Sequence, residues 1–238
     1  MREFEVLASD KSLTPVVPLK FSDQKTFDPL STYVVAVCVS RAFQEIEYVY
    51  QSVLTQEEIE RSLCFFFDND RRNYIVRRYF LRTLLSKFNT VAPQQIQFHT
   101  YENMKPAVSG IEFNLSHSGD FIVIALSHSG IGIDIEYLKR SFDFRDVLTN
   151  CFNEEEMSFV LQGDIALNFY SLWTRKEAVL KATGEGLTDM LQLLNCLPDV
   201  VSRKEKSFKL ITFRIQKDYV LSLATDAKQT DSVIYLIH

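Results

Sequence analysis

The chain of 238 residues is 46% hydrophobic and 24% charged, which is the composition of an ordinary soluble globular protein, and it is long enough for one large domain or two halves. The net charge of −5 argues against general nucleic-acid binding. No apolar run reaches the length of a membrane span, the first residues lack the apolar core of a signal peptide, and the four cysteines form no Cys-x-x-Cys motif. We therefore expect a cytoplasmic protein with reduced thiols that binds neither nucleic acid nor membranes.

Hydrophobic patterns along the chain predict an α+β protein with helices and strands in each half. Two capping boxes, Thr55 with Glu58 and Asn153 with Glu156, predict the starts of short helices and are structural signals only. Longer helices are expected at residues 70–88 and 168–183, and strands at 33–39, between 111 and 136, and near 208–215, 219–224 and 232–237.

The expected helix at residues 70–88 carries five arginines, at positions 71, 72, 77, 78 and 82. They concentrate positive charge on an otherwise acidic chain, and such a patch can attract an anionic ligand or partner. The alternative is an ordinary solvated helix face, which would account for part of the set.

The pentapeptide Leu-Ser-His-Ser-Gly occurs twice, at Leu115–Gly119 and Leu126–Gly130, on either side of a continuous apolar run. The apolar run predicts a buried strand, and each Ser-His-Ser-Gly then predicts a turn. A turn histidine is usually exposed and has no role, and we accept that interpretation for His128.

The segment Gly130–Glu136 alternates isoleucine with glycine or an acid, which predicts a strand with one apolar face. Asp134 and Glu136 then share a face at a spacing of about 6.6 Å and can converge on one cation, while Gly132 leaves room for a ligand to approach the backbone. The alternative is an amphipathic strand with a wet face. However, Asp is disfavoured in strands, and two unpaired acids on one face repel each other.

The segment Trp173–Glu185 predicts a helix on which residues four apart lie one above another. Trp173, Glu177 and Lys181 therefore form one stripe, with Lys176 close beside it. A carboxylate between two ammonium groups suits a site that handles a metal and phosphates together. An ordinary surface helix with a stabilising Glu-to-Lys pair is the alternative.

Together the strand and the helix supply three carboxylates, Asp134, Glu136 and Glu177, with no Cys or His beside them. Hard oxygen donors of this kind suit Mg²⁺ or Mn²⁺ rather than zinc, and Mg²⁺ usually completes its coordination with water and substrate phosphate. The chemistry that these residues imply is transfer at a phosphate.

Three blocks of the sequence, taken together, resemble the 4′-phosphopantetheinyl transferases, in particular the single-chain type that activates surfactin synthetase. Their residues, order and spacing all match, and the resemblance extends from about Asp68 to Leu187. The blocks are Phe113–Ser118 preceded by Met104–Pro106, then Gly132–Glu136, and then Trp173–Leu187.

The resemblance implies a fold of two similar α+β halves in a pseudo-twofold arrangement, each with a small antiparallel sheet packed against a long helix. We place the N-terminal half at residues 1–129 and the C-terminal half, which carries the metal site, at residues 130–238. The first thirty residues form an extension of unassigned structure. Coenzyme A would lie between the halves, and we expect a monomer.

The resemblance also implies an activity. The family moves the 4′-phosphopantetheine arm of coenzyme A onto a serine of an apo acyl or peptidyl carrier protein and releases adenosine 3′,5′-bisphosphate. Asp134, Glu136 and Glu177 would hold Mg²⁺, with Mn²⁺ as the alternative, on the coenzyme A diphosphate. The other residues that the resemblance assigns to phosphates of coenzyme A are Lys176, Lys181, Ser116, His117, Lys105 and one of Arg71 and Arg72. Lys105 follows Met104 where the family often has glycine, and the sequence does not decide between the two arginines.

Glu177, directly or through a water, is expected to take the proton of the attacking serine, while Lys181 offsets the developing charge. Two rival hypotheses stay open. One is a non-catalytic protein that binds coenzyme A or a carrier protein, and the other is a different Mg²⁺-dependent enzyme acting on a nucleotide diphosphate. The sequence does not indicate whether fatty acid, polyketide or nonribosomal peptide synthesis is served.

Overall fold

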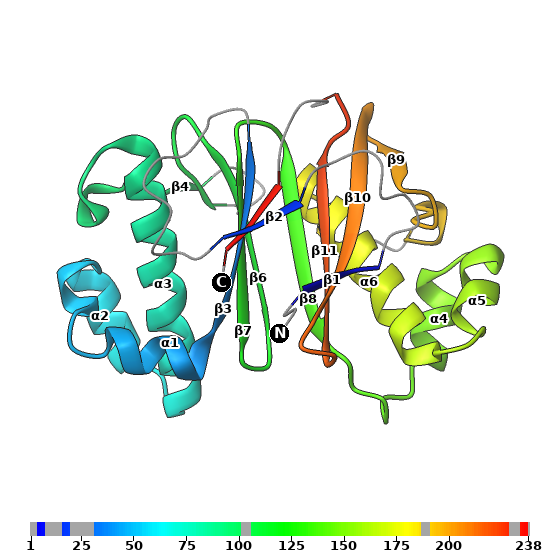
Figure 1. The fold of residues 1–238 in the computed structure, drawn as a ribbon, viewed down its shortest axis with the longest axis horizontal. Coiled ribbons are helices and arrows are strands. Elements are labelled where there is room, and N and C mark those ends of the chain that lie inside the picture. Colours follow the sequence, from blue (N-terminus) through cyan, green and yellow to red (C-terminus); the bar gives the residue numbers. More distant parts are fainter. Residues whose placement is uncertain are drawn as a thin grey trace.

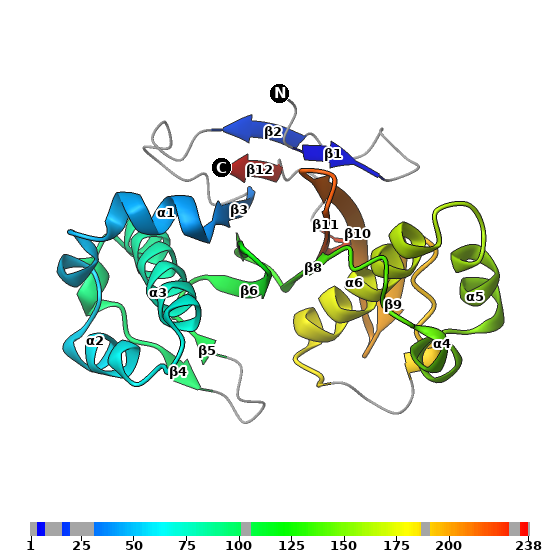
Figure 2. The same ribbon diagram turned by 90° about the horizontal axis from the view of Figure 1, so that it is seen from below.

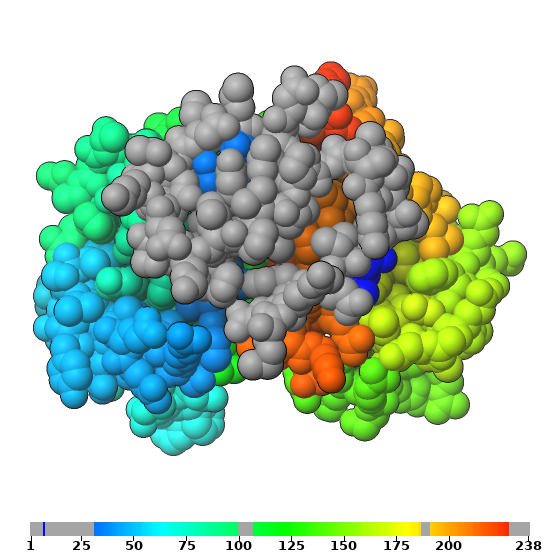
Figure 3. All heavy atoms as spheres, in the orientation of Figure 1, coloured from blue at the N-terminus to red at the C-terminus, as the bar shows by residue number. Residues whose placement is uncertain are grey.

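The computed structural model describes residues 4–7, 16–19, 31–100, 106–186, 191–228 and 234–237. They form an α+β fold of two halves, and each half packs one long helix against a small sheet (Figure 1). This is the fold class expected from the sequence. In the same orientation, Figure 3 shows the helices of the two halves as separate lobes on either side of the molecule.

The first half is built around the long helix α3. Its helices are α1 (Val39–Ile46), α2 (Gln56–Leu63) and α3 (Asp68–Asn89), and 3-10 turns lie at Tyr50–Ser52 and Pro93–Gln95. Its strands are β3 (Thr32–Cys38), β6 (Glu112–Ser118), β7 (Phe121–Ser127) and the two-stranded ribbon of β4 (His99–Thr100) and β5 (Pro106–Ala107).

The second half is built around the long helix α6. Its helices are α4 (Arg145–Cys151), α5 (Glu154–Val160) and α6 (Ile165–Thr183), with a 3-10 turn at Leu191–Leu193. Its strands are β8 (Ile131–Tyr137), β9 (Val200–Arg203), β10 (Lys206–Ile215) and β11 (Tyr219–Asp226).

The terminal strands cross between the halves. Strand β1 (Phe4–Val6) pairs with β10, so that the sheet of the second half has the order β1-β10-β11-β8, with β9 also paired to β10. Strand β12 (Ile234–Ile237) lies parallel to both β2 (Val16–Leu19) and β3, so that the other sheet has the order β2-β12-β3-β7-β6. Figure 2 shows β1, β2 and β12 together at one side of the molecule. The expected division at residue 130 therefore does not hold for the terminal segments, because each end of the chain adds a strand to the sheet of the other half.

Apolar cores lie between the two sheets and beneath each long helix. Alternate residues of a strand point to opposite faces, and on β3 Tyr33 and Val35 pack towards α3 while Val34 and Ala36 pack towards the second sheet. Strand β7 is buried along its whole length for the same reason, since it has a core on each face. This explains the continuous apolar run in the sequence.

Most elements expected from the sequence are present, and both capping boxes are confirmed at the N-termini of α2 and α5. Helices α1 and α4 and strand β9 were not expected. The first Ser-His-Ser-Gly is not a turn as expected, because β6 continues through Ser118 and the chain reverses at Gly119 and Asp120. In the part of the chain that the structure describes, no helix has both the length and the apolar character that a membrane span requires.

Candidate functional site

The edge strands β6 and β8 bring the two sheets together at the junction of the halves (Figures 1 and 2). The isoleucines of β8 enter the core between the sheets, so its polar residues face helix α6. There the Lys181 ammonium donates a hydrogen bond to Asp134 Oδ1 at 2.6 Å and another to Ser116 Oγ at 2.9 Å. Ser116 Oγ in turn donates to Asp134 Oδ1 at 2.7 Å. One residue from each of three elements thus forms a closed triangle.

Asp134 is one corner of this triangle, and the charges of Glu136 and Glu177 interact with it, so we call Asp134, Glu136 and Glu177 the acidic centre. Burial raises the pKa of Asp134 against the opposing effect of Lys181. Burial and the charge of Asp134 raise the pKa of Glu136. The pKa of Glu177 is raised mainly by burial. The negative charges of Asp134 and Glu136 raise it further. The carboxylates from β8 and α6 therefore lie within electrostatic range of one another, and their charges are only partly compensated by Lys181.

The acidic centre fits a divalent cation in its donor chemistry. Asp134 is 4% exposed, and its Oδ2 atom is buried without a hydrogen-bond partner among the described residues. A buried carboxylate oxygen without a partner is costly, and a cation would satisfy it. As the side chains stand, no group of three or more His, Cys, Asp or Glu residues within the described ranges is arranged to hold a metal ion. Lys181 occupies Oδ1 of Asp134, so cation binding requires the side chains to rearrange around Oδ2.

Gly132 has a different role from the expected one. A Cβ atom at this position would lie 2.0 Å from the Ala178 carbonyl oxygen and 2.5 Å from the Ala182 amide nitrogen of α6. The glycine therefore lets the helix approach the strand closely, which brings Glu177 and Lys181 to Asp134. It does not open the backbone to a ligand.

Lys176 does not lie where the resemblance placed it. Its side chain is 1% exposed, forms an ion pair with Glu156 at 2.8 Å, and donates to the carbonyls of Leu191 and Leu194. The ring of Phe152 lies below the ammonium at 5.2 Å. The expected contact with phosphate is corrected: three acceptors in the core of the second half use this ammonium, and Lys181 is the lysine at the acidic centre.

Ser116 and His117 point to opposite faces of β6. Ser116 is buried and bonded to Asp134 and Lys181, whereas His117 is exposed and lines a cavity of about 340 Å³ with Arg77 and Asp70 of α3. Because successive strand residues face opposite sides, the two side chains do not point to one place in this structure, and their expected contacts with phosphate stay predictions. His117 remains a candidate for a phosphate contact. His128 is exposed, with its ring 6.3 Å from that of Phe88.

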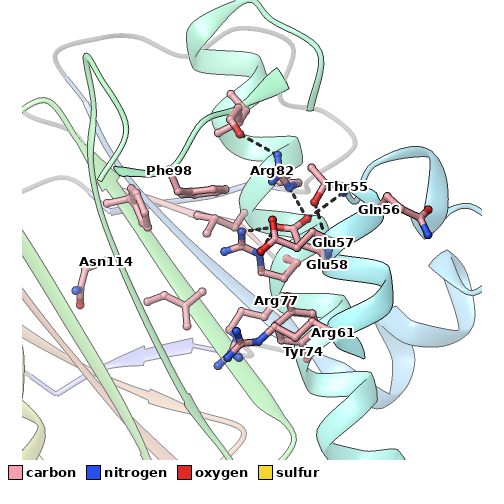
Figure 4. Close-up of a pocket in the computed structure, with 15 residues that line it drawn as sticks. Thr55, Gln56, Glu57, Glu58, Arg61, Tyr74, Arg77, Arg82, Phe98 and Asn114 are labelled. Atoms are coloured by element: carbon pink, nitrogen blue, oxygen red, sulfur yellow. Dashed lines mark hydrogen bonds and ion pairs between the residues drawn. The ribbon is translucent and has the colours of Figure 1, made fainter. Parts of the chain in front are cut away.

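A larger cavity of about 850 Å³ lies between α2, α3 and β6, and we call it the α3 groove. It shares Tyr74 and Arg77 with the cavity beside His117. Figure 4 shows Arg61, Tyr74 and Arg77 gathered at one end of the groove and Phe98 at the other. The α3 groove thus combines cationic groups with aromatic and aliphatic walls.

The five arginines of α3 serve different purposes. Arg78 and Arg82 both bind Glu58, with Arg82 Nε at 2.6 Å from Glu58 Oε2, and are structural. Arg72 lies 5.2 Å over the ring of Phe43. Arg71 Nε is buried and makes no hydrogen bond to the described residues.

Neither Arg71 nor Arg72 lines either cavity, whereas Arg77 lines both. Sequence reasoning missed Arg77, although it lies one helical turn from Tyr74 on the same face. Lys105, expected to contact a further phosphate, lies outside the described residues.

Comparison with known proteins agrees with this architecture. The family model described as "4′-phosphopantetheinyl transferase, N-terminal" matches residues 42–129, and the model described as "4′-phosphopantetheinyl transferase superfamily" matches residues 130–228. The 4′-phosphopantetheinyl transferase HetI of Nostoc sp. is 34% identical over 152 residues, which cover 60% of this chain and 64% of HetI. The 4′-phosphopantetheinyl transferase Sfp of Bacillus subtilis is 29% identical over 151 residues, which cover 61% of this chain and 66% of Sfp. A phosphopantetheinyl transferase of Thraustochytrium sp. is 26% identical over 208 residues, 75% of this chain and 72% of the relative.

The fold and the site define a protein of two α+β halves, with carboxylates and a lysine brought together where the halves meet. The two adjoining family matches account for most of the chain, and the chain belongs to the 4′-phosphopantetheinyl transferase superfamily. It spans just under two thirds of the length of HetI and Sfp.

Proposed function

We propose that this protein transfers the 4′-phosphopantetheine arm of coenzyme A to a serine hydroxyl of an apo acyl or peptidyl carrier protein, with the help of Mg²⁺ or Mn²⁺. The observation that carries the proposal is the position of the acidic centre and Lys181. They lie at the junction of the halves, against one face of strand β6. The opposite face of β6 lies towards the cavities beside α3.

The α3 groove and the adjoining cavity suit the nucleotide end of coenzyme A. Their volumes lie within the range of small-molecule sites. Tyr74 and Phe98 offer aromatic surface for a base, and Arg61, Arg77 and His117 offer donors for a 3′-phosphate. The diphosphate would then lie near Lys181, with the pantetheine arm leading out of the site.

The acidic centre and Lys181 suit the transfer itself. The serine oxygen attacks the phosphorus that bears pantetheine, and the bond from this phosphorus to the bridging oxygen breaks. Adenosine 3′,5′-bisphosphate leaves with the electron pair. Glu177 accepts the serine proton, directly or through a water, and burial raises the pKa of this carboxyl, which makes it a better base than an exposed Glu. Lys181 places positive charge beside the leaving phosphate. A divalent cation held by the three carboxylates would neutralise diphosphate oxygens.

The experiment that tests the proposal incubates the protein with coenzyme A, Mg²⁺ and apo carrier proteins from fatty acid, polyketide and nonribosomal peptide synthesis. Mass spectrometry should show addition of the arm to at least one carrier. Glu177→Gln should slow the addition by at least about 100-fold, the contribution typical of a general base, without lowering the temperature of thermal unfolding. The exposed Glu205→Gln is the control and should react at the wild-type rate.

The outcomes separate this proposal from its rivals. If coenzyme A binds but no carrier gains mass, the protein is a non-catalytic binder. If a nucleotide diphosphate is cleaved without a carrier, a different phosphate chemistry is at work.

A further inference from the structure

Strands β6 and β8 are joined through side chains rather than through a backbone ladder. Asn114, Ser116 and Ser118 occupy alternate positions of β6, and all three bond to β8. Asn114 Oδ1 accepts a hydrogen bond from the Ile133 amide at 2.9 Å, and Ser118 Oγ accepts one from the Tyr137 amide at 3.0 Å. This polar row belongs to the first half, and the strand that it contacts belongs to the second.

Two bonds of the row end on carboxylates of the acidic centre. Ser116 Oγ donates to Asp134 Oδ1 at 2.7 Å, and Ser118 Oγ donates to Glu136 Oε2 at 2.9 Å. Each hydroxyl also accepts a hydrogen bond, from Lys181 in one case and from a backbone amide in the other. Since the cited donor occupies one lone pair of each hydroxyl, the single proton of that hydroxyl is left to donate to the carboxylate.

This pattern leaves Oδ2 of Asp134 buried and without a partner in the part of the chain that the structure describes. A hydrogen bond on one oxygen fixes the rotation of a carboxylate and turns the other oxygen to a fixed place. Such contacts behind a ligand set the geometry of metal sites. Without the serine, the carboxylate of Asp134 is free to turn both oxygens towards Lys181, which would compete with a cation.

We infer that Ser116 and Ser118 are positioning residues for the acidic centre, through which the first half of the chain orients carboxylates that the second half supplies for a divalent cation. The inference rests on the proposed function, since it requires that the acidic centre bind a cation.

The test measures Mn²⁺ binding by the full chain in the presence of coenzyme A, from the loss of the electron paramagnetic resonance signal of free Mn²⁺, with coenzyme A alone as the blank. Ser116→Ala and Ser118→Ala should each weaken Mn²⁺ binding about 10- to 100-fold. Ser118→Thr keeps the hydroxyl and should restore most of the affinity.

Two variants serve as controls, and urea unfolding is measured for every variant. Asn114→Ala removes a bond between the halves that touches no carboxylate, and because Asn114 also lines the α3 groove, the comparison is made at a coenzyme A concentration that saturates each variant. Under that condition its Mn²⁺ affinity should stay within about threefold of wild type in the folded protein. Ser202→Ala removes an exposed hydrogen bond between the hydroxyls of Ser202 on β9 and Ser207 on β10. It should leave Mn²⁺ affinity unchanged.

Each outcome has a distinct meaning. The inference fails if both serine variants bind Mn²⁺ like wild type while Asp134→Asn does not, and the proposed cation site then stands. It also fails if Asn114→Ala weakens binding as much as the serine variants do, because the row would then only join the halves. If wild type binds no Mn²⁺ at all, the cation of the proposed function is lost and the inference with it.

Discussion

Replacing Lys176 with methionine should destabilise the fold strongly and leave the recognition of coenzyme A unchanged in the molecules that remain folded. Lys176 and Glu156 are 1% and 0% exposed and form an ion pair at 2.8 Å. Methionine has a similar volume, but it would leave a buried carboxylate and the carbonyls of Leu191 and Leu194 without this donor. Removing one partner of a buried ion pair costs about 3–5 kcal/mol, and we expect the free energy of unfolding to fall by about 4 kcal/mol.

Urea unfolding followed by circular dichroism measures this loss, and a double-mutant cycle with Glu156→Gln assigns it to the pair. Glu156 accepts from the amides of Asn153 and Cys196 at 3.1 and 2.8 Å on its two separate oxygens, and Gln, with one acceptor oxygen, can keep one of these two bonds. The double variant should be at least about 1 kcal/mol more stable than Lys176→Met alone, because a neutral amide costs less to bury than an unpaired carboxylate. The exposed Lys206→Met is the control and should stay within about 0.5 kcal/mol of wild type.

Two results would refute this reasoning about Lys176. One is a loss of less than about 1 kcal/mol, which would mean that the ion pair does not support the fold. The other is a rise in the KM for coenzyme A as large as that caused by Lys181→Ala, which would return Lys176 to the phosphates.

Three further predictions follow from the site. Gly132→Ala should lower the free energy of unfolding by about 3 kcal/mol or more, because its Cβ would collide with backbone of α6, while Gly130→Ala, which has open space, should change it little in the same urea assay. Arg77→Met should raise the KM for coenzyme A at least about 10-fold, which is the effect of losing one charged hydrogen bond. Arg72→Met should leave this KM unchanged, because Arg72 lies over Phe43 and outside the groove. Equal effects of the two variants in steady-state kinetics would contradict the assignment. Burial raises the pKa of Asp134 in the folded state, so its contribution to stability is full below the unfolded pKa and is lost as pH rises through the folded value. Asp134→Asn should therefore be more stable than wild type in cation-free buffer at pH 8, and the difference should shrink below about pH 4 in thermal unfolding scans; no change with pH would count against it.

Local patterns predicted the elements that carry the site. The alternation of residues 130–136 predicted β8 with both acids on one face, and the spacing of Glu177 and Lys181 predicted their common stripe on α6. These inferences hold because the periods of strands and helices fix which side chains share a face.

Contacts between distant segments could not be predicted in the same way. Lys176 differs from Lys181 only in its position around α6, and its burial depends on where α5 and the turn at Leu191–Leu193 pack. The close approach of α6 to Gly132 and the bonds from Ser116 to β8 likewise depend on how the halves meet.

The most direct test of the central claim is the position of the cation with coenzyme A bound. Crystals of the protein with coenzyme A and Mn²⁺ would locate the ion by its anomalous scattering. We expect one Mn²⁺ within roughly 2.5 Å of oxygens of Asp134, Glu136 and Glu177, with Lys181 on a phosphate oxygen. An ion held by other residues, or a diphosphate bound away from these three carboxylates, would contradict the claim.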